Sequence, residues 1–292
     1  MHTTGDRVLD KPLAQIGGDG VFIAEIERAL LERRIDLAVH SLKDLPTVQP
    51  EGLRLVVMGP REDVRDALVS NIPCSLTARG LHFDGGDVSA PIRIGTCSLR
   101  RAAQLRALCP PAEILPIRGN VDTRLRKLDG GDFDAIILAA AGLHRLELQE
   151  QLAGRMTYFP AEVLLPAPGQ GALAVEMRDE SLLWELLAPL NDAATLAAAS
   201  AERAFMRALG AGCYLPVAAY GEVSETTLTL SGLVIDLDGQ RQVRVRQSLP
   251  WTPQSSVEQA EALGGALAEQ ALARGADAII QSVRTGQERQ YV

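Results

Sequence analysis

The chain has 292 residues, of which 29 are Lys or Arg and 37 are Asp or Glu, so its formal net charge is −8. This acidic balance argues against a general nucleic-acid binder, which needs a basic surface to meet phosphates. Hydrophobic residues make up 47% of the chain, but the longest apolar run, 135–143, is far shorter than the ~20 residues that span a bilayer. We therefore expect a globular protein with a sizeable core and no membrane span.

The amino terminus and the cysteines indicate a reducing compartment. Residues 1–6 contain neither a basic stretch nor an apolar one, so they do not predict a secretory signal. The four cysteines are too few for a disulfide framework, none is spaced C-x-x-C, and the four histidines are scattered. We expect a cytoplasmic protein that binds no metal.

The first half of the chain alternates helices and strands. An amphipathic helix is predicted over 22–34, and the Pro-, Gly- and Ser-containing stretch 71–90 is predicted as a surface loop. The alternation predicts a mainly parallel sheet with helices on both faces. The other predicted elements are strands at 35–40, 53–58, 92–94, 113–117 and 134–139, and helices at 98–108 and 121–128.

The second half changes rhythm after a Pro/Gly-rich stretch at 164–172, which we interpret as a crossing between domains. A buried strand is predicted at 173–176, and Asp238-Gly239 lies where a hairpin turn belongs. The remaining elements predict a small α+β domain with an antiparallel sheet. They are helices at 193–209 and 257–274 and strands at 215–220, 227–235 and 242–249.

Positive charge is concentrated in one window of this acidic chain. Residues 93–127 hold eight Lys or Arg against two acids, and several of the arginines follow predicted strands directly. Open α/β sheets bind ligands at the carboxyl ends of their strands, and the arginine fork suits carboxylates and phosphates. We interpret Arg106, Arg126 and Lys127 as solvated helix faces. The predicted anion site comprises Arg100, Arg101, Arg118, Arg124 and Arg145, with the hydroxyls of Thr96 and Ser98.

Two further positions can carry chemistry. Lys43 and Asp44 follow a predicted strand; such a pair is usually a surface ion pair, but in an arginine-rich site an ionised Asp44 can stabilise a cationic intermediate or pass on a proton. Cys97 lies within the predicted anion loop, whereas Cys213 follows a helix carboxyl end, which raises the pKa of a thiol. The local setting alone therefore favours Cys97.

Five segments in the same order resemble the hydroxymethylbilane synthase family, also called porphobilinogen deaminase. They are VHSLKDLP at 39–46, GTCSLRR at 95–101, RGNVDTRL at 118–125, LPAPGQGA at 165–172 and GCYLP at 212–216, and the resemblance runs from residue 3 to the end. It implies two periplasmic-binding-protein-like α/β domains flanking a cleft, plus a C-terminal α+β domain with a small antiparallel sheet. The expected boundaries are 1–60 with 170–190, then 61–169, then 191–292.

The resemblance also implies a function. It is that of a monomeric transferase of tetrapyrrole (haem) biosynthesis, which condenses four porphobilinogen molecules head to tail, releases ammonia at each step and yields linear hydroxymethylbilane. By position Cys213, in place of Cys97, matches the residue that holds a dipyrromethane cofactor through a thioether, and Asp44 matches the catalytic aspartate. The implied cofactor-binding residues are Lys43, Asp44, Thr96, Ser98, Arg100 and Arg101, and the implied substrate-binding residues are Ser41, Arg118, Arg124, Arg145 and Gln170.

Three departures from the family pattern leave alternatives open. The family's opening strand and helix, with an arginine and a serine, have no counterpart; Asp19 stands where lysine is common, and Ala211 where glycine is frequent. We expect a chain without that opening segment to be destabilised and weakly active or inactive. The alternatives are a non-catalytic two-lobed anion-binding module and a truncated inactive relative.

Overall fold

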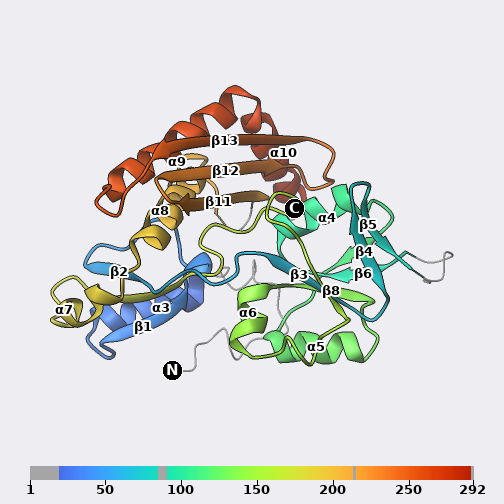
Figure 1. Ribbon diagram of the computed structural model, residues 1–292, viewed down its shortest axis with the longest axis horizontal. Helices are drawn as coiled ribbons and strands as arrows, with labels where there is room; N and C mark the ends of the chain where they lie inside the picture. The colour runs from blue at the N-terminus through green and yellow to red at the C-terminus, as the bar shows by residue number, and fades with distance from the viewer. Residues whose placement is uncertain (1–19, 85–90, 213–214, 291–292) are drawn as a thin grey trace.

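The computed structural model describes residues 20–84, 91–212 and 215–290. Within these residues the strands form three sheets and one separate hairpin, and helices pack against each sheet (Figure 1). In Figure 1 an antiparallel sheet, β11–β12–β13, lies above two mixed α/β units, which lie at the lower left and lower right. The site described below draws its residues from both lower units.

The first unit is a three-stranded sheet in the order β1-β10-β2, with β10 antiparallel to both neighbours. Successive strand residues face opposite sides of the sheet. Val57 and Ala174 therefore pack with Ile23 on one face, while Val56 and Val175 pack against the helix Leu183–Leu187 on the other. The unit comprises α3 (Gly20–Leu31), β1 (Leu37–Ser41), η1 (Leu42–Asp44), β2 (Leu53–Met58), β10 (Leu173–Arg178), α7 (Leu183–Leu187) and η2 (Ala188–Leu190).

The second unit is a five-stranded sheet in the order β7-β6-β8-β3-β9. β6 is parallel to β7 and β8, whereas β3 is antiparallel to β8 and β9. Its elements are β3 (Asp66–Ser70), β6 (Arg93–Gly95), α4 (Leu99–Leu108), β7 (Glu113–Leu115), α5 (Val121–Asp129), β8 (Ala135–Ala139), α6 (Ala140–Arg145) and β9 (Met156–Tyr158), with the hairpin β4 (Cys74–Thr77) and β5 (Gly80–Phe83) beside them.

The third unit is the antiparallel sheet β11–β12–β13 with three helices packed on it. The helices Ala193–Ala208 and Val257–Ala273 pack with their backbones in close contact, since a Cβ on Gly264 would lie 2.3 Å from the carbonyl oxygen of Ala201. The elements are α8 (Ala193–Ala208), β11 (Val217–Ser224), β12 (Thr227–Ile235), β13 (Gln242–Pro250), α9 (Val257–Ala273) and α10 (Ala276–Gln290).

The predicted α/β alternation and the C-terminal antiparallel sheet are confirmed, but two local predictions are wrong. Neither sheet is mainly parallel: every pair in the first is antiparallel and the second is mixed, because β3 and β10, each reached by a crossing between the two units, run against their neighbours. The stretch 71–90 is not simply a loop, because its described part contains the β4–β5 hairpin. Elements that the sequence did not predict are β3, β9, α6, α7 and α10.

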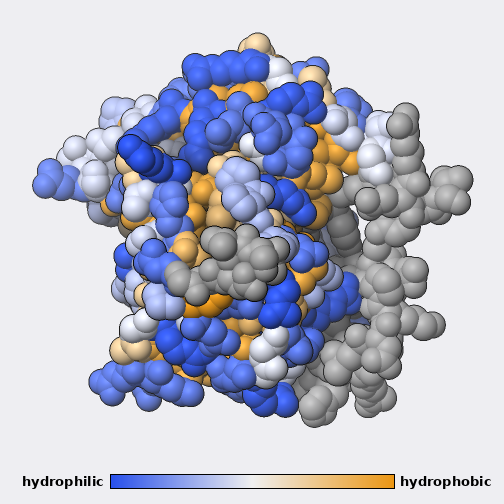
Figure 2. All heavy atoms as spheres, turned by 90° about the vertical axis from the view of Figure 1, so that its right-hand side faces the viewer, coloured by the Kyte–Doolittle hydropathy of each residue, from blue (hydrophilic) through white to orange (hydrophobic). Residues whose placement is uncertain are grey.

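The face of the molecule near the second sheet is mostly polar among the described residues (Figure 2). Figure 2 shows the side of the molecule that carries the β4–β5 hairpin, where hydrophilic residues dominate and hydrophobic ones appear between them. Among the described helices, none combines the length and the apolar character needed to cross a bilayer.

Candidate active site

The turn that follows β1 presents Lys43 and Asp44. Leu42 and Leu45, on either side of this pair, are buried, so Asp44 is exposed on a turn whose apolar residues are fixed in the core. The amide of Leu42 donates to the carbonyl oxygen of Ala172 at 3.0 Å and so ties the turn to the chain just before β10. Ser41, the N-cap of this 3-10 turn, makes no side-chain capping bond.

The predicted anion loops lie at one edge of the second sheet. β6, β7 and β8 are parallel, so the loops after them emerge together. Thr96 Oγ1 accepts from the amide of Ser98 at 3.1 Å, and Ser98 in turn caps the N-terminus of α4 by accepting from the amide of Arg101 at 3.5 Å. The hydroxyls of Thr96 and Ser98 therefore fix the loop before α4, whose first turn contains Arg100 and Arg101.

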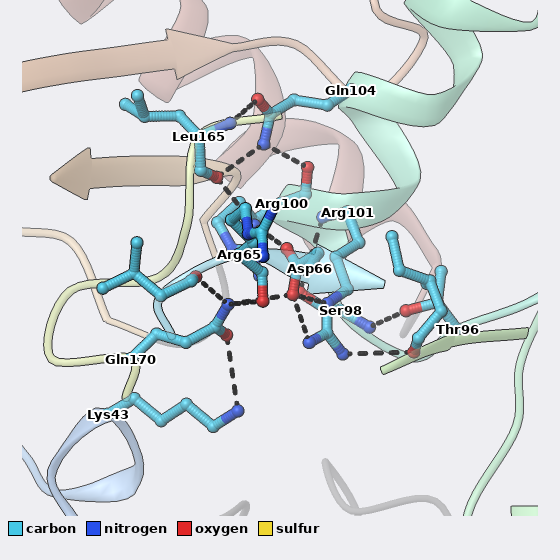
Figure 3. A network of polar contacts seen from close by, with 12 residues as sticks. Lys43, Arg65, Asp66, Thr96, Ser98, Arg100, Arg101, Gln104, Leu165 and Gln170 are labelled. Carbon is cyan, nitrogen blue, oxygen red and sulfur yellow. Dashed lines mark hydrogen bonds and ion pairs between the residues drawn. The ribbon is translucent and has the colours of Figure 1, made fainter. Parts of the chain in front are cut away.

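A buried carboxylate that the sequence did not reveal holds both of these arginines. Asp66 opens β3 opposite Ala139, the last residue of β8, and so lies at the same edge as the loops. It accepts from Arg100 Nη1 at 2.8 Å, from Arg101 Nη2 at 2.6 Å and from Gln170 Nε2 at 2.9 Å (Figure 3). We call Asp66, Arg100, Arg101 and Gln170 the Asp66 cluster.

The cluster carries more positive than negative charge. Burial alone would raise the pKa of Asp66, but the charges of Arg100 and Arg101 and their hydrogen bonds outweigh it and hold that pKa well below its usual range. Two guanidinium groups thus share one carboxylate. Burial and then repulsion from Arg101 lower the pKa of neighbouring Lys43 to about 8, which shows that this ammonium lies in a cationic, partly dry environment.

Gln170 connects the Asp44 turn to the cluster. Lys43 points toward it, and Nζ donates to its Oε1 at 3.4 Å, while its Nε2 donates to Asp66 and, at 2.7 Å, to the carbonyl oxygen of Val64 (Figure 3). The backbone beside it approaches closely, since a Cβ on Gly169, whose φ is +75°, would lie 3.1 Å from the amide nitrogen of Lys43. The two α/β units therefore meet at the predicted site.

The remaining predicted arginines lie around this junction. Arg124 Nε donates to the carbonyl oxygen of Gly119 at 2.7 Å, and burial followed by repulsion from Arg101 lowers its pKa, with Asp44 opposing the shift. Arg145 is exposed and donates from Nη2 to the carbonyl oxygen of Gly171 at 2.8 Å. Arg118 is partly buried, and its carbonyl oxygen accepts from Lys127 at 3.4 Å. Arg124 is thus an electrostatic neighbour of Asp44, and Arg145 is attached to the crossing.

A second buried carboxylate, also missed from sequence, lies behind the site. Glu202 on α8 accepts from both Nη atoms of Arg61, at 2.6 and 2.9 Å, and from the amides of Gly169 and Gly221, each at 2.6 Å. Arg61 and Gly169 belong to the two crossings between the α/β units, whereas Gly221 lies in β11. This Glu202 cluster, made of these four residues, joins all three units. Its sequence signal is spacing, because Glu202 shares a helical face with buried Ala198 and Phe205.

Some sequence predictions cannot be placed. Cys213 and Asp19 lie outside the described residues. Cys97 is exposed, and its Sγ donates to the carbonyl oxygen of Ile117 at 3.1 Å.

Within the described ranges, no group of three or more His, Cys, Asp or Glu side chains is placed to hold a metal ion. The arrangement presents fixed cations and one exposed carboxylate, which suits binding of a polycarboxylate next to a developing positive charge.

Comparisons with known proteins agree with the sequence resemblance. The family model "Porphobilinogen deaminase, dipyromethane cofactor binding domain" matches residues 1–184, and "Porphobilinogen deaminase, C-terminal domain" matches 196–273. Porphobilinogen deaminase of Syntrophotalea carbinolica is 50% identical over 284 residues, which cover 97% of this chain and 84% of the relative. That of Chromobacterium violaceum is 48% identical, covering 97% of this chain and 86% of the relative.

Among solved structures the likeness is loose. An ancestral arginine-binding protein bound to arginine matches 57% of this chain and 67% of its own, with 14% identity and a TM-score of 0.31. The periplasmic aliphatic sulphonate binding protein SsuA from Escherichia coli matches 63% of this chain and 56% of its own, with 15% identity and a TM-score of 0.34.

Proposed function

The chain belongs to the porphobilinogen deaminase family, and on this premise we propose which of its residues carry the reaction. It is a hydroxymethylbilane synthase of tetrapyrrole (haem) biosynthesis, a transferase that joins four porphobilinogen molecules head to tail on a dipyrromethane cofactor and releases ammonia at each step. The enzyme prediction is confirmed, and neither the anion-binding module nor the inactive relative is favoured.

The described residues fit a dipyrromethane. Two pyrrole rings with two carboxylates each bring four negative charges, and the Asp66 cluster with Lys43 supplies a surplus of fixed cations from both α/β units. When bound, the cofactor supplies the nucleophilic pyrrole carbon on which the chain grows. We assign its carboxylates to Lys43, Arg100 and Arg101, with the loop shaped by Thr96 and Ser98, and its thioether to Cys213.

Asp44 is the residue we assign to the chemistry. Loss of ammonia from porphobilinogen leaves positive charge on its pyrrole, and a carboxylate held beside that ring stabilises this charge and can move the proton that the leaving amine needs. The observation that carries the assignment is convergence: exposed Asp44 lies on a fixed turn and is an electrostatic neighbour of both Lys43 and Arg124. An isolated surface ion pair would have no such surroundings.

The incoming porphobilinogen carries two carboxylates of its own, for which we assign Arg118, Arg124 and Arg145, with Ser41 beside the Asp44 turn. Gln170 is fully buried with its amide bonded to Asp66, so we assign it an indirect role, in which it orients Lys43 toward the cofactor that accepts the substrate. In this assignment the arginines hold substrate through carboxylates, and the reacting carbon is left to Asp44.

We also propose the organisation and setting of the enzyme. The first domain comprises 1–60 and 170–190, the second 61–169 and the third 191–292; the separate sheets support the division of the first two, and a C-terminal family model that begins at residue 196 supports the third. The enzyme is proposed to act as a cytoplasmic monomer on a small-molecule substrate, without nucleic-acid or membrane partners. The net charge of −8 supports the absence of nucleic-acid partners.

The Asp44→Asn variant tests the catalytic assignment. It keeps the size of the side chain but removes its charge, so we expect ammonia release to fall by ~100-fold or more while porphobilinogen binding persists. The matched control is Asp36→Asn, at the opposite end of the same strand, where the carboxylate is exposed and paired with Arg178 at 3.1 Å. Turnover by Asp44→Asn within about twofold of the control would contradict the assignment.

The cofactor attachment is tested by intact mass under denaturing conditions, with the protein expressed in a host that makes porphobilinogen. We expect an increment of two pyrrole units that is lost in Cys213→Ser and kept in Cys97→Ser. Cys97 is the appropriate control because it is exposed beside the site arginines. Loss of the increment in Cys97→Ser alone would move the attachment to that residue.

A further inference from the structure

Residues 47–49, which follow the Asp44 turn, line a groove together with Arg203 and Arg207 of α8. This groove has a volume of about 430 Å³. The turn before this segment packs on α8 through Leu42 and Leu45, which share a buried cluster with Ala199. Two arginines of α8 span the groove. Its lining is Thr47, Val48, Gln49, Leu53, Arg54, Leu55, Arg203, Arg207 and Glu261.

Of these two arginines, Arg203 contacts the two residues that directly follow Asp44 in the chain. Its Nη2 donates to the carbonyl oxygen of Pro46 at 2.6 Å and its Nη1 to that of Leu45 at 3.4 Å. Within the described residues both of its hydrogen bonds therefore end on main-chain carbonyls rather than on a carboxylate. Burial, and then repulsion from Arg207, lower the pKa of Arg203 to about 10, so the protein keeps this cation in an unfavourable place.

We propose that Arg203 is a positioning residue for the reaction: by holding the carbonyls of Leu45 and Pro46 from α8, it fixes the turn that presents Asp44. This inference rests on the proposed role of Asp44. Arg203 acts through the backbone and not by contact with substrate.

The start of the turn is fixed without Arg203, and the side chain of Leu45 packs in a cluster with Ala199 of α8, so what Arg203 adds is a hold on the backbone carbonyls just after Asp44. The amide of Leu42 is bonded to Ala172, and Gly169 abuts Leu42 and Lys43. These contacts hold the start of the turn, whereas the amide of Leu45 returns only to Leu42, at 3.2 Å. Beyond Asp44 the backbone is extended, with φ −79° and ψ 142° at Leu45, and Arg203 clamps it there.

The same helix leads to the proposed cofactor residue. α8 ends at Ala208, and Cys213 follows shortly afterwards in the chain. Through Arg203 the helix that precedes the cofactor attachment also sets the position of the catalytic carboxylate. The cofactor-bearing unit and the catalytic turn are thereby placed relative to each other by one rigid element.

The test compares Arg203→Gln and Arg203→Lys with the wild-type holoenzyme, and it measures kcat and KM for porphobilinogen by ammonia release. We expect Arg203→Gln to lower kcat by ~10- to 100-fold with less than about twofold change in KM, because a misplacement of about 1 Å is enough for such a loss. Arg203→Lys, which can still reach one carbonyl, should recover part of kcat. Intact mass should show the cofactor retained in both variants.

Arg207→Gln is the matched control, because Arg207 lies one helical turn away and donates to the carbonyl oxygen of Thr47 at 3.3 Å, farther along the same segment. We expect its kcat to stay within about twofold of wild type. Equal losses in both variants, a rise in KM alone, or wild-type kcat in Arg203→Gln would overturn the inference. If Arg203→Gln does not fold, Arg203→Lys with wild-type kcat would overturn it. If Asp44→Asn is itself active, the proposed function fails, and the inference fails with it.

Discussion

The Asp66 cluster and the Glu202 cluster are built from the same parts and do opposite things. Each centres on a carboxylate with no exposed surface, and each uses arginine and glycine-rich crossing segments. Around Asp66 two arginines share one carboxylate, and Lys43 stands beside them. Around Glu202 one arginine meets one carboxylate, and two backbone amides complete its hydrogen bonds.

The two clusters differ in the ratio of cations to carboxylates and not in the types of residue they contain. The Glu202 cluster is neutral and its acceptors are filled, so it can only join the three units. The Asp66 cluster retains net positive charge, so it is both a joint and a receptor for anions. In this protein, the excess of cations over carboxylates is what separates the cluster proposed to bind anions from the one that only joins the units.

The largest effect is expected from Glu202→Gln. The substitution leaves Arg61 buried without a counter-charge and turns an amide donor toward one of the glycine N–H groups, Gly169 or Gly221. Breaking a buried pair in this way costs about 3–5 kcal/mol in the free energy of unfolding. The urea midpoint of the purified holoenzyme measures the loss.

The control for this variant is Glu261→Gln, in an ion pair with Arg207 in which both side chains are about 40% exposed. Removing an exposed pair costs about 0–1 kcal/mol. If the two variants shifted the urea midpoint equally, the Glu202 cluster would not be the joint described here.

A smaller loss, about 3 kcal/mol, is expected from Asp66→Asn in the holoenzyme. The reason is that carboxylates of bound cofactor can replace part of the lost negative charge between Arg100 and Arg101. In a Cys213→Ser background, which we expect to lack the cofactor, the same substitution should cost more. Urea midpoints of the four proteins give the coupling between the two positions.

Glu202→Gln is the comparison for that coupling, because its cluster is neutral and closed. Its loss should be the same with and without Cys213. Equal coupling at Asp66 and Glu202 would show that surplus charge is not what separates the two clusters.

The anion loops could be predicted from sequence because they depend on local signals. Each arginine segment follows an apolar strand, and the ends of parallel strands lie at one edge of a sheet, so the sequence alone predicts that Arg100, Arg118 and Arg145 lie at one site. The same reasoning placed Asp44 after β1. The local sequence pattern is enough to predict the position of these residues, because each directly follows a strand and the strand direction fixes the edge at which it lies.

The carboxylates that hold these loops could not be predicted, because their roles depend on distant partners. Asp66 opens a five-residue strand within a charged stretch, and Arg100 is 34 positions away. For Glu202 the spacing from Ala198 and Phe205 indicates a buried helical face but not its main partner, Arg61, which is 141 positions away. Only the antiparallel entry of β3 and the packing of α8 on the crossings create these contacts.

The smallest effect is a pH dependence at Lys43, whose pKa is lowered to about 8 by burial and by Arg101. Its charge is fully present below that pH and is lost as the pH rises through it. Because Lys43 is assigned to a carboxylate of the cofactor that accepts each porphobilinogen, we expect kcat for ammonia release to fall above about pH 8, by up to roughly tenfold, which corresponds to about 1.5 kcal/mol for one charged hydrogen bond. Lys43→Gln should already show the lowered kcat at pH 7, and its profile should be flat above pH 8.

Stability should move in the opposite direction over the same range. Between about 8 and the ordinary value of 10.5 the unfolded chain holds a proton at Lys43 that the folded protein has released, so the free energy of unfolding rises with pH there. Lys127→Gln, on α5, removes a lysine outside the cluster and should keep both trends. If instead the pH profile of Lys127→Gln were flat, the cation that titrates near pH 8 would be Lys127 and not Lys43. Lys43 would then not supply the surplus charge that distinguishes the Asp66 cluster from the Glu202 cluster.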